Sequence, residues 1–262
     1  MCGTEKQFGY EWGAYSEILP EHRDQFWTWV QPLQSEDFKG KRFLDAGCGM
    51  GRNSFWAMEA GAASGFAFDF DRRTVAAAER NLHSFPSCEV DYHSIYDLSL
   101  SDEFDIVFCI GVLHHLADPR RAVINLVKAA KPGGRVAVWV YGKEGNRLYL
   151  TFLRPLRILT QRLPLRVTRL LAWGITAVLR LGLPIAPETS YRKLLRRLSF
   201  RHLEAIVFDQ LFPTIANYWT RDESLALFAG LPISLQSITH THGHSWTLVF
   251  EKNRLPGRAG GN

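Results

Sequence analysis

Short apolar runs alternate with segments of helical composition through the first half of the chain. Five runs indicate strands that are covered on both faces, because each is apolar along most of its length. They span residues 42–48, 64–70, 88–94, 104–113 and 135–141. Helices are predicted between them at residues 54–60, 72–82 and 120–130. Alternation with such short connections predicts a doubly wound, parallel, right-handed α/β sheet.

The ends of several predicted elements carry recognisable signals. Asp71 is placed to cap the second helix, and the run from Lys131 to Gly134 is predicted to end the third through its proline and glycines. Near the C-terminus, Thr220 and Glu223 form a capping box for a helix that continues to Phe228. Two further strands at 233–241 and 246–252 are joined by a tight turn. They predict an antiparallel hairpin that completes a mostly parallel, seven-stranded sheet.

A glycine-rich loop follows the first strand. Asp45 precedes glycines at alternate positions, Gly47, Gly49 and Gly51, and a helix-compatible segment follows. This pattern predicts a strand, a tight turn and the start of a helix. In a doubly wound sheet a nucleotide binds at such a turn. The dinucleotide fingerprint would require a glycine where Arg52 stands, so that motif is excluded.

The loop has the spacing of a different cofactor family. An acid two residues before G-x-G-x-G resembles motif I of class I S-adenosylmethionine (SAM) dependent methyltransferases. The run from Phe104 to Leu116, which ends in Val112-Leu113-His114-His115, is similar to the small-molecule and ubiquinone-type branch of that family. The resemblance covers residues 41–142 well and the last hairpin loosely. It implies a Rossmann-like sheet, SAM as cofactor and methyl transfer as the reaction.

Candidate cofactor contacts follow from these positions. Asp69 ends the second strand about twenty residues after the glycine loop, where an acid accepts hydrogen bonds from a ribose diol, although it could instead cap the next helix. The resemblance implies that Ser94 contacts the adenine amino group and that Ile95 packs on the ring. It also places the methionyl amino group near Ile110. The full cofactor set is Asp45, Gly47, Gly49, Gly51, Asp69, Phe70, Ser94, Ile95, Ile110 and Tyr10.

Tyr10 belongs to an irregular aromatic segment, residues 8–15, that could cover a cationic sulfonium through aromatic faces. For catalysis, His114 lies at the carboxyl end of the fourth strand and could take a proton from a substrate hydroxyl. The alternative is that His114 and His115 only shape the loop. Methyl transfer needs few side chains, since alignment of the nucleophile and exclusion of water supply most of the catalysis. The substrate-side candidates are Tyr141, Tyr191, Asp209 and Tyr218.

Charge is distributed unevenly along the chain. The net charge is +5, yet residues 147–201 hold twelve Arg and Lys against the single acid Glu188. Residues 164–183 form an amphipathic helix, with Arg162, Arg166, Arg169 and Arg180 on one stripe and leucine and valine side chains opposite. A second basic helix is predicted over residues 192–201.

Three interpretations of this basic insert stay open. It could be a lid whose apolar face covers the cofactor and substrate while its arginines face water. It could rest on an anionic membrane to reach a lipid or quinone. It could bind acidic substrates or RNA, although no nucleic-acid partner is expected because few aromatic residues are interleaved with the basic ones. No apolar run approaches the roughly 20 residues needed to span a bilayer.

The remaining features exclude other kinds of site. The four cysteines form no C-x-x-C pair and are expected to be free thiols. His240, His242 and His244 flank a turn without an accompanying cysteine, so no metal site is expected. The N-terminus lacks the apolar core of a signal peptide, which favours a cytoplasmic protein.

The predicted organisation therefore has four parts. They are an N-terminal cap segment at 1–40, a SAM-binding domain at 41–143 and 203–252, the helical insert at 144–202 and a flexible tail at 253–262. The expected function is methylation of a small-molecule acceptor in a biosynthetic pathway. The alternatives are a membrane-associated lipid or quinone methyltransferase, and a SAM-using enzyme of this fold that performs non-methyl chemistry such as an intramolecular displacement.

Overall fold

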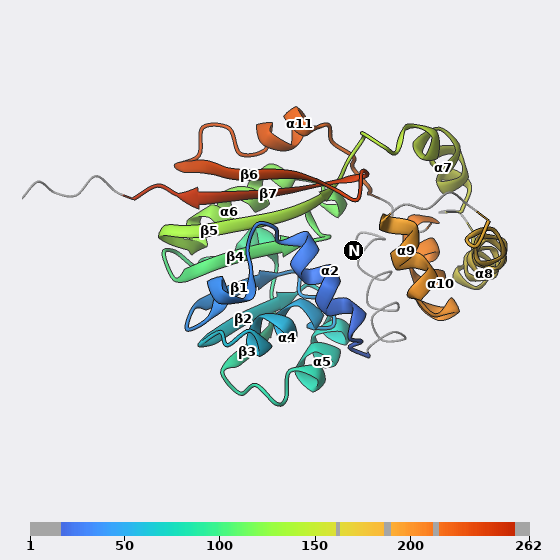
Figure 1. Cartoon of the computed structure of the whole chain (residues 1–262). Helices are drawn as coiled ribbons and strands as arrows, with labels where there is room; N and C mark the ends of the chain where they lie inside the picture. The colour runs from blue at the N-terminus through green and yellow to red at the C-terminus, as the bar shows by residue number, and fades with distance from the viewer. Residues whose placement is uncertain (1–16, 161–162, 186–189, 212–214, 255–262) are drawn as a thin grey trace, which may run out of the picture.

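The computed structural model describes residues 17–160, 163–185, 190–211 and 215–254. A seven-stranded sheet with strand order β3-β2-β1-β4-β5-β7-β6 forms its centre (Figure 1). Strand β7 is antiparallel to its neighbours β5 and β6, and the other neighbouring pairs are parallel. The strands are β1 Arg42–Ala46, β2 Ser64–Asp69, β3 Cys88–Tyr92, β4 Phe104–Ile110, β5 Ala130–Tyr141, β6 Ile233–Thr241 and β7 Ser245–Lys252. The predicted mostly parallel sheet with a C-terminal hairpin is confirmed.

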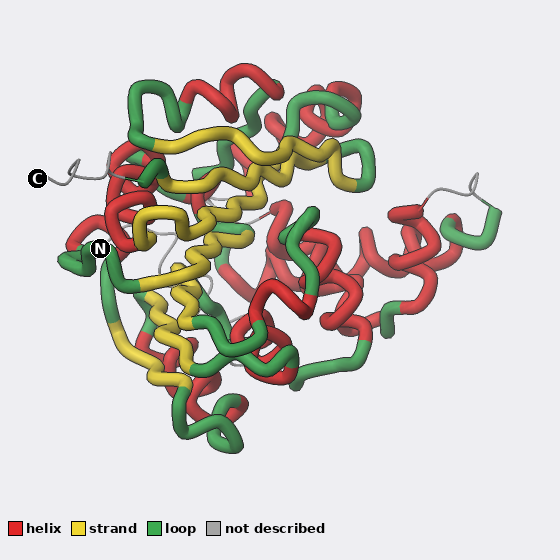
Figure 2. The backbone as a smooth tube through the Cα atoms, turned by 60° about the vertical axis from the view of Figure 1, so that its left-hand side comes forward, coloured by secondary structure: helices red, strands yellow, loops and turns green. Residues whose placement is uncertain are grey.

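Helices cover both faces of the sheet and form a separate group at one end. One face carries α2 Glu21–Trp29, α3 Ser35–Phe38, α4 Arg52–Glu59 and α5 Arg72–Asn81, and the other carries α6 Pro119–Ala129 and α11 Arg221–Ala226. The separate group lies beside the carboxyl ends of the parallel strands (Figures 1 and 2). It consists of α7 Arg147–Thr160, α8 Leu165–Gly182, α9 Ser190–Arg197 and α10 Phe200–Leu211.

Alternating side chains of each strand supply two hydrophobic cores. On β1, Phe43 packs under α2 and α4 whereas Leu44 packs under α6, as the period of two in a strand requires. Phe26, Phe38, Phe43 and Phe108 form a buried aromatic cluster on the first face, with the rings of Phe43 and Phe108 stacked at 5.5 Å. Edge-to-face contacts between such rings add to the stabilisation from burial alone. This rigid sheet holds the loops at the strand ends in place.

The predicted capping signals are present. The Asp71 carboxylate accepts a hydrogen bond from the backbone N–H of Arg73 at 2.8 Å and so caps α5. Thr220 and Glu223 form the reciprocal capping box at the start of α11.

The segment from Lys131 to Gly134 differs from its prediction. Helix α6 ends at Ala129 and β5 begins at Ala130, so this segment belongs to the strand rather than to a loop that ends the helix. Gly133 has a φ of 79°, and the pairing of β5 with β4 shifts register between Phe104 and Ile106. The proline and glycines thus form an irregular strand start, a role that the sequence pattern does not distinguish from a helix end.

The basic insert also differs from its prediction. Helix α8 packs on α10 through Thr168, Ala172 and Thr176, which are fully buried, and most of its large apolar side chains are exposed. The lid therefore stays a prediction, and the structure shows that most of the apolar face of α8 is turned to solvent. The second basic helix is interrupted between α9 and α10. The sequence defines the faces of an amphipathic helix, but the packing of its neighbours decides which one is buried.

Candidate functional site

The glycine loop between β1 and α4 forms the floor of the site. The backbone N–H groups of Gly47 and Cys48 both donate to the carbonyl O of Phe68 at 2.9 Å, which ties the loop to β2. Gly47 has a φ of 79°, and a Cβ there would lie 2.4 Å from Cγ2 of Val112. Two features therefore disfavour a side chain at this position: the left-handed backbone conformation and the close contact with Val112. The loop therefore brings its backbone close to whatever occupies the site.

Asp69 lies at the end of β2 beside this loop. The backbone N–H of Gly49 donates to Oδ2 of Asp69 at 3.0 Å, and the backbone N–H of Asp71 donates to Oδ1 at 3.1 Å. Burial raises the pKa of Asp69 to about 6, although these N–H donors act in the opposite direction. Each carboxylate oxygen retains acceptor capacity, since an ionised carboxylate has about four lone-pair positions. The carboxylate is thus held at a fixed place with room for further donors.

A cavity of about 960 Å³ opens above the loop and Asp69 and extends to the insert helices. Its walls come from the exits of β1, β2, β4 and β5, from α2, and from α8, α9 and α10. The predicted site residues that line it are Gly47, Gly49, Asp69, Phe70, Ser94, Ile95, Ile110, Tyr141 and Tyr218. The sequence therefore identified residues from both the sheet side and the insert side of one cavity.

Several predicted residues lie elsewhere. Tyr10 lies outside the described residues, as do the side chains of Tyr191 and Asp209. Gly51 does not line the cavity but begins α4, and a Cβ there would lie 3.0 Å from the side chain of Leu82. Its role is to let the loop turn into the helix close to α5.

Asp45, which was predicted to contact the cofactor, does not line the cavity. It is fully buried, and the hydroxyl of Ser54 donates to its Oδ2 at 2.7 Å. Burial raises the pKa of Asp45 to about 7. The side chain instead links the end of β1 to the first turn of α4 and so fixes the glycine loop from behind.

His114 is also misplaced for the role of a base. It is fully buried, does not line the cavity, and stacks on the ring of Tyr141 at 3.7 Å. Neither ring nitrogen has a hydrogen-bond partner within the described residues. Burial, together with the positive charges nearby, lowers the pKa of His114 well below its usual value. The ring of His114 thus contacts Tyr141 and does not border the cavity.

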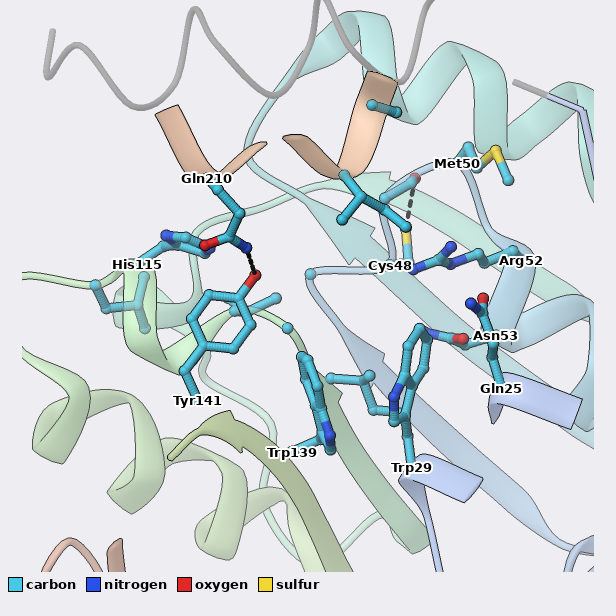
Figure 3. A pocket seen from close by; sticks show the side chains of 18 of the residues that line it. Gln25, Trp29, Cys48, Met50, Arg52, Asn53, His115, Trp139, Tyr141 and Gln210 are labelled. Carbon is cyan, nitrogen blue, oxygen red and sulfur yellow. Dashed lines mark hydrogen bonds between the residues drawn. The ribbon is translucent and has the colours of Figure 1, made fainter. Parts of the chain in front are cut away.

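The neighbouring His115 lines the cavity (Figure 3). Its Nδ1–H donates to the carbonyl O of Ile215 at 2.8 Å, because a carbonyl can only accept. This hydrogen bond makes Nε2 the basic nitrogen of the neutral ring. The sequence analysis named His114 as the candidate base, whereas the structure places His115 at the cavity. The short 3-10 turn Leu113–His115 sets which of the two rings borders it.

A hydrogen-bonded group of side chains forms the wall opposite the glycine loop. Gln210 donates through Nε2 to the hydroxyl of Tyr141 at 3.2 Å and accepts through Oε1 from the hydroxyl of Tyr218 at 3.1 Å (Figure 3). The buried Arg157 donates to the Tyr218 hydroxyl at 3.4 Å. Backbone bonds from Asn217 to His114 and from Trp219 to Tyr141 hold this segment against the strand exits. Gln210 and Arg157 had no motif that could have identified them.

Residues from α2 and α4 complete the site on the other side. Gln25 and Asn53 line the cavity, and Oε1 of Gln25 and Oδ1 of Asn53 are buried without a hydrogen-bond partner among the described residues (Figure 3). Trp29 and Trp139 lie with their rings 5.2 Å apart at the cavity wall. Unlike the buried ring nitrogens of His114, these two acceptors belong to residues of the cavity wall, where a bound ligand can supply the donors.

Comparison with known protein families finds a match in the first five strands of the sheet. A family model described as "Methyltransferase domain" matches residues 44–138, which run from β1 to β5 and include the glycine loop and Asp69. Residues 44–138 are thus similar to a methyltransferase domain. The sheet order with its reversed β7 agrees with this assignment.

Proteins similar in sequence to this chain include several named ubiquinone biosynthesis O-methyltransferase. The chain is 34% identical to the one from Hydrogenovibrio crunogenus over 55% of this chain and 56% of the relative. It is 28% identical to the one from Pseudomonas putida over 70% of this chain and 85% of the relative. An uncharacterised protein of Synechococcus is 34% identical over 46% of this chain and 32% of its own length. The chain thus spans about half or less of several of these curated relatives.

Solved structures share the fold of this chain. One is a magnesium protoporphyrin IX methyltransferase from Synechocystis with bound SAM, which has a TM-score of 0.53 and 14% identity and covers 89% of this chain and 80% of its own. Another is a methyltransferase of Haloferax volcanii in complex with an activator, with a TM-score of 0.57, 14% identity and coverage of 97% and 100%. At these identities the likeness concerns the fold alone.

Proposed function

We propose that this protein is a SAM-dependent methyltransferase that modifies a small-molecule acceptor in a biosynthetic pathway. The observation that carries the proposal is the Asp69 carboxylate, held by Gly49 and Asp71 at the edge of the glycine loop and open to the cavity. An acid at the end of the second strand is the group that accepts hydrogen bonds from a ribose diol in Rossmann-like sheets. The cavity volume of about 960 Å³ is at the upper end for ligand sites, which suits a cofactor and an acceptor together.

The residues of the site fit SAM along its whole length. Asp69 would hold the ribose, while Ser94, Ile95 and Phe70 would surround the adenine. The unpartnered oxygens of Gln25 and Asn53 would accept hydrogen bonds from the methionyl ammonium. When bound, SAM supplies a sulfonium-activated methyl group.

His115 is the best-placed base for an acceptor hydroxyl. Its hydrogen bond to Ile215 fixes the tautomer with Nε2 basic, and its ring borders the same cavity as Tyr141 and Gln210. A base in this position would remove the proton from the acceptor oxygen as the methyl group is transferred to it. The relatives named O-methyltransferases support oxygen as the atom that is modified. The apolar residues of α8, α9 and α10 would exclude water from the reacting atoms.

Product analysis tests this proposal. The protein is incubated with SAM alone and with SAM plus each of a set of phenols and catechols, and the adenosyl products are separated by liquid chromatography and mass spectrometry. We expect S-adenosylhomocysteine together with a methylated acceptor, and neither product without an acceptor. Methylthioadenosine from SAM alone would contradict methyl transfer. Absence of SAM binding by calorimetry would contradict the cofactor assignment.

A further inference from the structure

The outer face of helix α8 is apolar and exposed to solvent. Leu170, Val178 and Leu181 are 70%, 72% and 77% exposed, and Val167 and Leu171 are exposed beside them. At 3.6 residues per turn these five positions fall within an arc of about 100°, so they lie on one side of the helix. The helix has 18 residues and is about 27 Å long at 1.5 Å per residue. Exposed apolar patches of this extent mark interaction sites.

The orientation of α8 is fixed by its other faces. Thr168, Ala172 and Thr176 are fully buried towards α10, and the guanidinium of Arg169 forms an ion pair of 3.4 Å with Glu204 of that helix. A rotation of α8 that buried the exposed leucines would therefore expose Thr168, Ala172 and Thr176 and break the Arg169–Glu204 ion pair. The packing of α8 on α10 thus keeps the apolar face turned to solvent.

Helix α7 extends the same surface. The hydroxyl of Thr168 donates to the carbonyl O of Thr160 at 3.3 Å, which joins the end of α7 to the start of α8. Ile158 and Leu159 at this end are 60% and 59% exposed. We call the exposed side chains of Ile158, Leu159, Val167, Leu170, Val178 and Leu181 the outer apolar face. It lies on the group of helices that stands apart from the sheet (Figures 1 and 2).

The charge of the surrounding segment indicates what covers this face. Residues 147–201 carry twelve Arg and Lys and one acid. Arg157 is buried and Arg169 pairs with Glu204, whereas Arg166 is exposed next to Val167. A second copy of the chain would bring two such basic segments together, which like-charge repulsion opposes. Anionic lipid headgroups would instead meet the arginines while the apolar side chains enter the acyl boundary. Within the described ranges, no helix has the length and apolar character to cross a membrane, so a surface position remains.

We propose that the outer apolar face docks on an anionic lipid bilayer, with α8 lying along the interface. The docking helix also contributes to the cavity, because Ile175 and Leu179 line it and Ile175 is itself exposed. A path along α8 thus joins the bilayer to the cavity. If the proposed methyl transfer is correct, this path admits an apolar acceptor dissolved in the membrane. The docking itself does not depend on the reaction.

Sedimentation with vesicles tests the docking. The full-length protein is mixed with vesicles of phosphatidylcholine alone or of phosphatidylcholine and phosphatidylglycerol at three to one, at low and at high salt. We expect pelleting with the anionic vesicles at low salt and a clear reduction at high salt, because the headgroup attraction is screened. Equal pelleting without vesicles, or none with anionic vesicles, would overturn the proposal.

Variants separate apolar from basic contributions. The triple variant Leu170→Gln, Val178→Gln, Leu181→Gln is expected to weaken vesicle binding by more than about tenfold, since each side chain loses most of its transfer free energy. Arg166→Gln is expected to weaken it by about fivefold. The matched control is Ile124→Gln on α6, where the apolar side chain is 42% exposed on the sheet side of the molecule. Unchanged binding by the triple variant would refute docking through this face.

Two further measurements keep the outcomes distinct. SAM affinity of the triple variant, measured by calorimetry, is expected to equal that of the unaltered protein, which shows that the fold and the cofactor site are intact. Vesicle binding without any SAM binding would retain the docking and reject the proposed function. Light scattering that shows a dimer in the unaltered protein and a monomer in the triple variant, without vesicle binding, would assign the face to a second copy and overturn the proposal.

Discussion

Protonation of Asp69 is expected to control the affinity for SAM. The carboxylate must be ionised to accept hydrogen bonds from both ribose hydroxyls through lone pairs that Gly49 and Asp71 do not use. Burial raises the pKa of Asp69 to about 6, so the group titrates close to neutral pH. The neutral form would carry a proton on one of the two oxygens and lose an acceptor. Affinity should therefore fall as the pH falls through 6.

The magnitude follows from the fraction of ionised carboxyl. With a pKa of about 6, nearly all Asp69 is ionised at pH 7.5 and about one tenth at pH 5. If the ionised form alone binds, the apparent dissociation constant rises by about tenfold over this range. Asp69→Asn should weaken binding at pH 7.5 by roughly ten- to a hundredfold, the usual worth of hydrogen bonds to a charged group.

Isothermal titration calorimetry of SAM at pH 7.5, 6 and 5 measures these effects. His22 lines the cavity, but burial lowers its pKa to about 3, so it stays neutral across this range. Asp45 does titrate nearby, because burial raises its pKa to about 7. Asp45→Asn is therefore the matched control and should keep the fall in affinity, whereas Asp69→Asn should abolish it. An affinity that is independent of pH in the unaltered protein would refute the reasoning.

Three other predictions concern the frame of the site and its base. Gly47→Ala should destabilise the fold by about 1–3 kcal/mol in thermal unfolding, because φ is 79° and the new Cβ would lie 2.4 Å from the Val112 side chain. The additional substitution Val112→Ala should restore part of this lost stability, because it removes the close contact. Asp45 has a folded pKa of about 7 against an ordinary 3.8, so the free energy of unfolding should fall from pH 4 to pH 8, by at most about 4 kcal/mol from this group. Asp45→Asn should flatten that slope in denaturant titrations. His115→Gln should lower kcat by about 100-fold or more with little change in SAM affinity, and an unchanged kcat would reject His115 as the base.

The sheet could be predicted from the sequence because each signal was local. Apolar runs set the strands, and Asp71 and Thr220 marked helix starts by a side-chain bond to the next turn. Lys131 to Gly134 was mistaken for a helix end, since proline and glycine occur both there and in an irregular strand start. Local composition does not separate the two.

The cofactor side of the cavity was predictable where the chain passes through a motif. Gly47, Gly49 and Asp69 are close in sequence and were found, whereas Gln210 reaches Tyr141 across 69 residues and was not. The choice between His114 and His115 depended on the direction of one short turn. The outward face of α8 depended on small residues packed against α10, which periodicity alone does not reveal.

The proposed SAM site is built around Asp69. A crystal structure of the protein with S-adenosylhomocysteine tests it most directly. We expect the ribose hydroxyls within hydrogen-bond distance of the Asp69 carboxylate and the methionyl ammonium near Gln25 and Asn53. We expect the sulfur to face the part of the cavity that His115 and Tyr141 border. A nucleoside bound elsewhere, or a ribose without contact to Asp69, would contradict it.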